Sequence, residues 1–223
     1  MIDPYESPRL EMIASQIERR GLHDPRLLAA FRSVPRHYFI STEAAKQAYD
    51  DTPLPIGGGQ TISQPYIVAL MTDLLQLQGD ETVLEIGTGS GYQAAILAAL
   101  ARSVHTIERD AELAEKARRL LPSMGYSNVS VHESDGCLGW PEQAPYPAIL
   151  VTAAAPAPPP ALLEQLSNGG RLVIPIGGHK GQILQVWQRQ GVDFMAEDIL
   201  NVSFVPLRGS CGWSESEWAL KSE

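Results

Sequence analysis

Polar side chains follow three consecutive glycines in the stretch "LPIGGGQTISQPY", residues 54–66. The residues there that could line a site are Gln60, Thr61, Ile62 and Ser63. Closely spaced hydroxyls can orient an oxygen nucleophile by donating hydrogen bonds to it. Ser63 also stands two residues before Pro65, a position from which it could cap a helix that begins at the proline. The local sequence therefore leaves two roles open for Ser63, an active-site donor or a helix cap.

A second glycine-rich stretch, "VLEIGTGSGYQAAILA", follows an apolar segment and opens a helical pattern. Gly87, Gly89 and Gly91 allow a tight turn and a close approach of the backbone to a ligand. A dinucleotide fingerprint would read G-x-G-x-x-G, with its last glycine at the position of Tyr92. The observed G-x-G-x-G spacing departs from that pattern.

Carboxylates stand at the ends of three successive expected strands. Glu85 lies inside the first strand, Glu108 ends the second, and Asp135 follows the third. An acid at the end of the second strand can bind ribose hydroxyls, and a buried acid in the first suits a cationic ligand. Each acid alone is ordinary for a turn or a cap. Together they predict a ligand with a ribose, an amine and a positive centre, and S-adenosylmethionine has all three.

Short apolar segments alternate with amphipathic helical patterns after Gly79. The expected strands are residues 82–86, 104–108, 129–132, 148–152 and 171–175. The expected helices between them are residues 93–101, 111–121 and 161–166. This alternation is typical of an α/β fold with a doubly wound, mostly parallel sheet, which binds ligands at the carboxyl ends of its strands. Segments 182–189 and 199–205 have no helical pattern between them and predict an antiparallel hairpin.

Helical periods dominate the chain before the sheet. The expected helices are residues 9–20, 25–31, 42–49 and 65–77. We interpret the chain as an N-terminal helical subdomain with the substrate and cofactor loop (1–78), a Rossmann-like core (79–209) and a peripheral tail (210–223).

Composition argues against several kinds of binding partner and site. The net charge of −9 argues against a nonspecific nucleic-acid surface. The five histidines have no metal-ligand spacing, so we expect no metal site. Cys137 and Cys211 lie far apart without a CxxC pair, so we expect no disulfide and an inert Cys137. No apolar run reaches the length of a membrane span and the start shows no signal pattern, so we expect a cytoplasmic protein, more readily a monomer than an obligate oligomer.

Several motifs together resemble the bacterial protein-L-isoaspartate O-methyltransferases, over nearly the whole chain from Arg9 to Gly209. They include "VPRHYFI", "LPIGGGQTISQPY", "VLEIGTGSGYQAAILA", "SDGCLGW", "APYPAILVTAAAP" and "LLEQLSNGGRLVIPIG". The glycine loop marks methyltransferases broadly, whereas "GQTISQP" is far more specific to this family. Two features depart from the family pattern: Cys137, where relatives more often carry a larger side chain, and the tail after Gly209.

The resemblance implies a class I methyltransferase sheet and methyl transfer from S-adenosylmethionine to the α-carboxylate of L-isoaspartyl residues in damaged proteins. Ser63 matches the serine usually assigned to the active site. The cofactor contacts that we expect are Gln60, Thr61, Ile62, Ser63, Glu85, Gly87, Gly89, Gly91, Glu108, Arg109, Asp135 and Gly136. Because a free α-carboxyl has a pKa of about 3.3–3.7, the nucleophile is ionised at neutral pH and needs no general base.

Three alternatives stay open at this point. A methyltransferase of nucleic-acid base amines would carry an Asn/Asp-Pro-Pro-aromatic segment after the fourth strand, where this chain reads "TAAAPAPPP". A methyltransferase of other carboxyls or of small molecules would share the same sheet. A cofactor-binding protein without catalysis would also share it, although such a protein could lose the hydroxyls of residues 60–63 freely.

Overall fold

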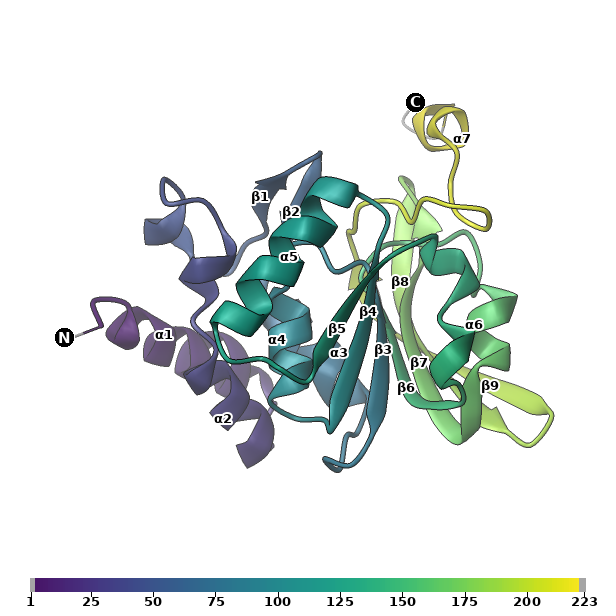
Figure 1. Ribbon diagram of the computed structural model, residues 1–223, viewed down its shortest axis with the longest axis horizontal. Coiled ribbons are helices and arrows are strands. Elements are labelled where there is room, and N and C mark those ends of the chain that lie inside the picture. The colour runs from purple at the N-terminus through teal and green to yellow at the C-terminus, as the bar shows by residue number, and fades with distance from the viewer. Residues whose placement is uncertain (1–2, 221–223) are drawn as a thin grey trace.

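A seven-stranded sheet forms the centre of the protein, in a computed structural model that describes residues 3–220 (Figure 1). Its order is β5-β4-β3-β6-β7-β8-β9; the first five strands in this order are parallel, and β8 and β9 continue it antiparallel. The strands are β3 (Thr82–Ile86), β4 (Ser103–Glu108), β5 (Val129–Glu133), β6 (Tyr146–Val151), β7 (Leu166–Gly178), β8 (Gly181–Gln190) and β9 (Asp193–Val202). This arrangement confirms the predicted fold class, including the antiparallel hairpin.

Helices cover both faces of the sheet, because the central strands bury side chains on both sides. The helices after β3 and β4 lie on one face and α6 on the other (Figure 1). Alternate residues of β3 accordingly belong to two separate cores. Val83 lies in the first core, and Leu84 and Ile86 lie in the second. The helices are α1 (Glu6–Met12), α2 (Pro25–Ser33), α3 (Pro65–Leu74), α4 (Tyr92–Ala98), α5 (Ala111–Ser123), α6 (Pro160–Glu164) and α7 (Glu215–Leu220).

The N-terminal helices pack on the first of these cores. Met12, Phe31 and Met71 are at most 1% exposed and belong to the same buried cluster as Val83. The expected boundary at residues 78/79 therefore does not separate two cores, and the division into three parts stays an interpretation. Asp24 caps α2 through a hydrogen bond from Arg26 N, as its position before Pro25 predicts.

Four local expectations need correction. The 42–49 helix shrinks to a single 3-10 turn, Ala45–Gln47, and the second strand of the hairpin begins six residues earlier than expected. Residues 54–62, expected as a loop, form a short hairpin of β1 (Leu54–Gly57) and β2 (Gln60–Ile62). The tail contains α7, which lies at the opposite end of the molecule from the N-terminus (Figure 1) and contacts the turn between β7 and β8, where the ring centroids of Trp218 and His179 are 4.1 Å apart; residues 221–223 lie outside the described part.

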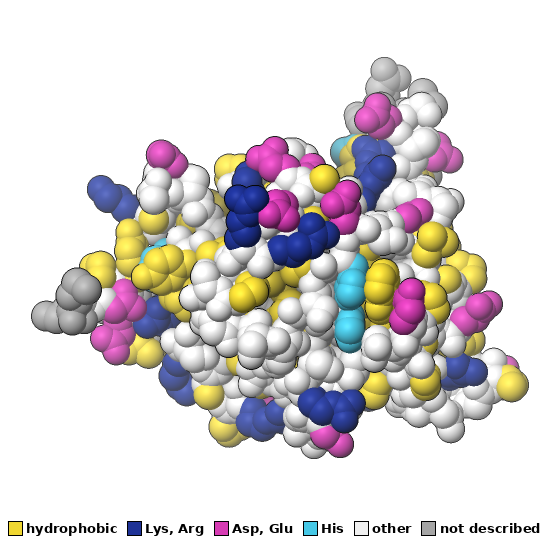
Figure 2. Space-filling model, viewed as in Figure 1, with side chains coloured by type: hydrophobic (Ala, Val, Ile, Leu, Met, Phe, Trp, Pro, Cys, Tyr) yellow, Lys and Arg dark blue, Asp and Glu magenta, His cyan; other side chains and the backbone are white. Residues whose placement is uncertain are grey.

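The two cysteines also differ from expectation, because Cys137 and Cys211 form a disulfide across 74 residues of sequence, with 5.6 Å between their Cα atoms. The pairing depends on how the tail folds back over the sheet, and spacing along the chain does not reveal it. On the face shown in Figure 2, acidic and basic side chains intermingle. Over residues 3–220, no helix combines the length and apolarity that a membrane span requires.

Candidate active site

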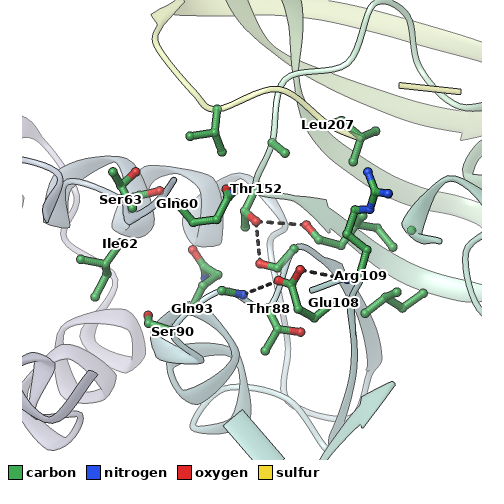
Figure 3. Close-up of a pocket in the computed structure, with 18 of the residues that line it drawn as sticks. Gln60, Ile62, Ser63, Thr88, Ser90, Gln93, Glu108, Arg109, Thr152 and Leu207 are labelled. Carbon is green, nitrogen blue, oxygen red and sulfur yellow. Dashed lines mark hydrogen bonds between the residues drawn. The ribbon is translucent and has the colours of Figure 1, made fainter. Parts of the chain in front are cut away.

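A cavity opens at the carboxyl ends of β3 and β4, where an open α/β sheet places its ligands. Its lining combines polar and apolar side chains and comes from several separate segments of the chain. Residues 60–63 form one side, and the segment Val205–Arg208 forms another. In Figure 3, Gln60, Ile62 and Ser63 lie on one side of the cavity, while Arg109 and Leu207 lie across from them.

The glycine loop forms the floor of this cavity. Gly87 has a φ of +96°, and a Cβ there would collide with the Oγ1 of Thr152. Thr152 Oγ1 instead donates to the carbonyls of Gly87 and Ile86, at 2.7 and 3.0 Å, the first of them from the loop itself. Thr152 thus fixes the turn from β6, a contact that only glycine permits.

Glu108 is held at the cavity wall by the main chain around it. Its Oε2 accepts from Gly89 N at 2.9 Å, and its Oε1 accepts from the N–H groups of Arg109 and Asp110. The side chain is buried yet lines the cavity. A carboxylate oriented this way has lone pairs left to accept from ligand hydroxyls, which fits the predicted ribose contact.

Glu85 lies behind the cavity wall, on the face of β3 opposite Leu84 and Ile86. It is fully buried, and burial raises its pKa to about 8. Thr106 Oγ1 donates to Glu85 Oε2 at 2.5 Å, and because that hydroxyl has one hydrogen, Thr88 Oγ1 donates to Thr106 at 2.7 Å. Because Thr88 lines the cavity, the hydroxyls of Thr88 and Thr106 connect the cavity to Glu85. Glu85 Oε1 is a buried acceptor without a partner in the described residues.

Asp135 is engaged by the protein itself. Its Oδ1 accepts from Cys137 N at 2.9 Å, and its Oδ2 accepts from Ser210 N, in the tail, at 2.8 Å. Burial alone would raise the pKa of Asp135, but these main-chain hydrogen bonds outweigh it and lower the pKa. The residue after it, Gly136, lines the cavity.

Ser63 does not cap the following helix. The N-cap of α3 is Gln64, and no side chain caps that helix end. Ser63 is half-buried at the cavity wall, and its carbonyl accepts from Arg36 Nη1 at 2.7 Å. The fully buried Arg36 also donates from Nε to Ala48 O at 2.7 Å and from Nη2 to Thr52 O at 3.4 Å. The guanidinium therefore holds the end of the β1–β2 hairpin by its main chain and leaves the hydroxyl of Ser63 free to face the cavity.

The structure brings most of the predicted site residues together. Those that line the cavity are Gln60, Thr61, Ile62, Ser63, Gly87, Gly89, Glu108, Arg109 and Gly136. Glu85, Gly91 and Asp135 do not line it, so a direct cofactor contact from these three stays a prediction. Gly91 has a structural role, because it begins α4 with a φ of +87°. No group of three or more potential metal ligands occurs in residues 3–220.

Arg36, Thr152 and residues 205–208 were not among the residues expected at the site. Arg36 lies inside "VPRHYFI", and nothing in that motif signals that an arginine there is buried. Thr152 ends the fourth expected strand, where a hydroxyl facing the loop could have been anticipated. The segment at 205–208 is brought to the cavity by a parallel bridge of Pro206 with Ala154, a long-range contact that no local pattern signals.

Comparison with known proteins adds the family. The sequence profile named protein-L-isoaspartate(D-aspartate) O-methyltransferase matches residues 8–212. The chain belongs to the protein-L-isoaspartate(D-aspartate) O-methyltransferase family. Among curated relatives, a protein-L-isoaspartate O-methyltransferase of Syntrophus aciditrophicus (strain SB) is 53% identical over 217 residues, covering 96% of this chain and all of the relative. One of Methanoregula boonei (strain DSM 21154 / JCM 14090 / 6A8) is 54% identical over 210 residues, covering 94% and 97%.

Solved structures support the fold of this methyltransferase family member. A protein-L-isoaspartate O-methyltransferase superposes with a TM-score of 0.84 at 28% identity, over 92% of this chain and 67% of the other. A Plasmodium falciparum protein described as a putative protein-L-isoaspartate O-methyltransferase, in complex with S-adenosyl-L-homocysteine, superposes with a TM-score of 0.78 at 23% identity, over 93% and 99%. The second likeness concerns the fold alone.

Proposed function

We propose that this enzyme transfers a methyl group from S-adenosylmethionine to the α-carboxylate of L-isoaspartyl residues in damaged proteins and peptides. Family membership supports the reaction. The structural observation that carries the proposal is that Thr61 and Ser63 line both the cofactor cavity and a second groove beside it. A methyl donor in the cavity and an acceptor in the groove would meet at these two hydroxyls.

The second groove offers space for an extended chain. It runs between residues 61–64 and residues 200–205, which are the end of the edge strand β9 and the three residues beyond it, and Ile67 and Phe204 add apolar surface. Residues beyond the end of an edge strand keep main-chain groups outside the ladder, and such groups can bind a polypeptide. A peptide in this groove would pass directly over Ser63.

The chemistry requires positioning more than proton transfer. Bound S-adenosylmethionine supplies a methyl group on a sulfonium, and an isoaspartyl α-carboxyl is already ionised at neutral pH. Ser63 and Thr61 would hold the carboxylate oxygen by hydroxyl hydrogen bonds that preserve its negative charge. Holding reactants in line can contribute up to about 7–11 kcal/mol.

The residues of the cavity fit the cofactor. Glu108 would accept from the ribose hydroxyls. The glycine loop and Gly136 would let the backbone approach the nucleoside, and Gln60 would contact the methionine end. Glu85 lies behind the wall and, with a pKa of about 8, keeps its proton at neutral pH, so it would support the site through Thr106 and Thr88 and not through a charge. The methyl ester would then lose methanol as the neighbouring amide nitrogen closes a succinimide, whose hydrolysis begins repair.

The proposal is tested by methyl transfer from labelled S-adenosylmethionine to two peptides that differ only in isoaspartate or aspartate at one position. We expect label on the isoaspartyl peptide alone, released as methanol in mild base. Label on neither peptide, with cofactor binding intact, would point to another carboxyl or small-molecule acceptor, or to a protein that only binds the cofactor.

The role of Ser63 is tested by Ser63→Ala. We expect turnover of the isoaspartyl peptide to fall about tenfold to a hundredfold, because one orienting hydrogen bond is lost, while cofactor affinity changes little. Ser130→Ala, at an exposed position of the edge strand β5, is the matched control and should retain full turnover. Unchanged turnover in Ser63→Ala would show that the hydroxyl does not act on the substrate.

A further inference from the structure

The disulfide Cys137–Cys211 connects two walls of the cofactor cavity. Cys137 belongs to the 3-10 turn Gly136–Leu138, and Gly136 lines the cavity. Cys211 lies three residues beyond the Val205–Arg208 segment that lines the other wall. The bond therefore joins the turn that follows β5 to the C-terminal segment across the cavity.

Residues 209–211 of the tail make further contacts with the turn at residues 135–137. Ser210 N donates to Asp135 Oδ2, and Cys211 N lies 3.1 Å from Cys137 Sγ. Gly209 has a φ of +136°, and a Cβ there would collide with the carboxylate of Asp135. The main chain at 209–211 thus lies directly against the Asp135–Cys137 turn.

The ends of this tail segment are anchored independently of the disulfide. Leu207 N donates to Ala154 O at 2.8 Å, and Trp213 Nε1 donates to Gly177 O at 3.2 Å. Between these anchors, only the disulfide and the contacts at Ser210 and Cys211 tie residues 208–212 to the turn in the described structure. Trp213 N donates to Leu207 O and Arg208 Nη1 donates to Trp213 O, so the stretch is also closed into a loop. Cleavage of the disulfide would weaken the attachment of this loop to the turn and leave its anchored ends in place.

We propose that Cys137 and Cys211 form a reversible thiol–disulfide site that controls exchange of the cofactor and its product. The oxidised form holds residues 208–212 against the Asp135 turn and keeps the cavity wall ordered. In the reduced form Arg208 and the turn at Gly136, which both line the cavity, must be ordered again each time the ligand binds, which weakens binding. The inference rests on the cofactor assignment made above, but it does not depend on the methyl acceptor.

The chemistry is thiol–disulfide exchange with a low-molecular-weight thiol. Cys211 is partly exposed, whereas Cys137 is 3% exposed, so the incoming thiolate attacks the sulfur of Cys211 and Cys137 leaves as a thiolate. A second thiol then resolves the mixed disulfide. Two small thiols are oxidised to one disulfide, their two protons end on Cys137 and Cys211, and the reverse reaction uses a small disulfide as oxidant.

The test is the affinity of the full-length protein for S-adenosylhomocysteine by calorimetry, after treatment with oxidised glutathione and after reduction with dithiothreitol. Peptide mapping first establishes the redox state of each sample. We expect the reduced protein to bind roughly three- to tenfold more weakly, with faster dissociation. The double variant Cys137→Ser/Cys211→Ser is the matched control, which should bind like the reduced protein and should not respond to dithiothreitol.

Each other outcome overturns the inference. Equal affinity of the two forms would show that the disulfide does not control the cavity, and the cofactor assignment would survive. The absence of a Cys137–Cys211 linkage after glutathione treatment of the folded protein would exclude the site itself. Loss of binding in every form would overturn the inference together with the cofactor assignment. A response of the double variant to dithiothreitol would trace the effect to something other than this pair.

Discussion

Two walls of the cavity are held in different ways. The wall formed by residues 60–63 is tied by the buried Arg36, through hydrogen bonds to main-chain carbonyls of Ser63, Ala48 and Thr52. The wall formed by the C-terminal segment is tied by a disulfide and by the carboxylate of Asp135. The first attachment is noncovalent and fully buried, and the second is covalent and lies near the surface.

The difference assigns a separate task to each wall. Burial lowers the pKa of Arg36 to about 10, so the guanidinium stays charged at neutral pH and its hold on Ser63 is constant. The residues proposed to position the acceptor therefore stand on a permanent support. The wall formed by the C-terminal segment rests on a bond that thiols can break, so it is the one suited to change between states.

The largest effect is expected from breaking the first wall with Arg36→Met. Methionine fills the volume of the arginine but leaves three carbonyls without their donor. The hydrogen bond to one of them, Thr52 O, is weak because its length is 3.4 Å. We therefore expect the free energy of unfolding to fall by about 3 kcal/mol. Turnover should fall more than cofactor affinity, because the Ser63 end of the hairpin is released. Urea unfolding and steady-state kinetics measure both. Arg36→Lys should recover part of the stability through its charge, and equal losses of turnover and cofactor affinity would contradict a specific hold on Ser63.

A smaller effect at neutral pH is expected from Glu85→Gln, which lies behind the cavity between the two walls. The carboxyl has a pKa of about 8 when folded against 4.5 when unfolded, because burial disfavours its charge. The native state binds the extra proton between these values, so the free energy of unfolding should fall as pH rises from about 4.5 to about 8. Glutamine cannot titrate, and the variant should lose that slope.

Urea unfolding of the cofactor-free protein at pH 5, 7 and 8.5 checks this expectation. Glu112→Gln, at an exposed position in the first turn of α5, should retain the wild-type slope. A slope shared by all three proteins would place the ionised form of Glu85 in the folded state.

The smallest effect is expected from Asp135→Asn, which weakens the second wall without cutting the disulfide. The amide offers Ser210 N a neutral acceptor at best, so we expect the free energy of unfolding to fall by about 1–2 kcal/mol at neutral pH. Since the pKa of Asp135 is lowered on folding, its contribution is present above the ordinary pKa of 3.8 and is lost as the pH falls through the folded pKa. The difference between variant and parent should therefore vanish in acid.

Redox state makes this third variant informative. In the oxidised protein the disulfide still holds the tail, so Asp135→Asn should weaken S-adenosylhomocysteine binding less than it does in the reduced protein. Calorimetry on both forms separates the possibilities. An identical loss in both forms would favour a direct contact of Asp135 with the cofactor over its role in holding the tail.

Sequence patterns predicted the strands of the sheet and most of the residues at the cavity floor. The apolar segments at 82–86 and 104–108 predicted β3 and β4 closely, because buried parallel strands are short and uniformly apolar. The glycine loop and Glu108 followed, since the carboxyl ends of parallel strands meet at one edge. The hairpin at 54–62 was missed, because a glycine run allows a turn as readily as an open loop.

The alternating strands and helices of the sheet, the glycine loop and the family motif at residues 60–63 could all be predicted from the sequence. Which carboxylates line the cavity could not be predicted in this way, since Glu85 faces away from the side chains of Leu84 and Ile86 on a strand that is buried on both sides. The tertiary structure decided this, and it also decided that Arg36 supports Ser63 and that Cys211 meets Cys137. The physical reason is shared: these are contacts between residues 27 and 74 positions apart, set by how the cap and the tail pack on the sheet and by no local preference of the chain.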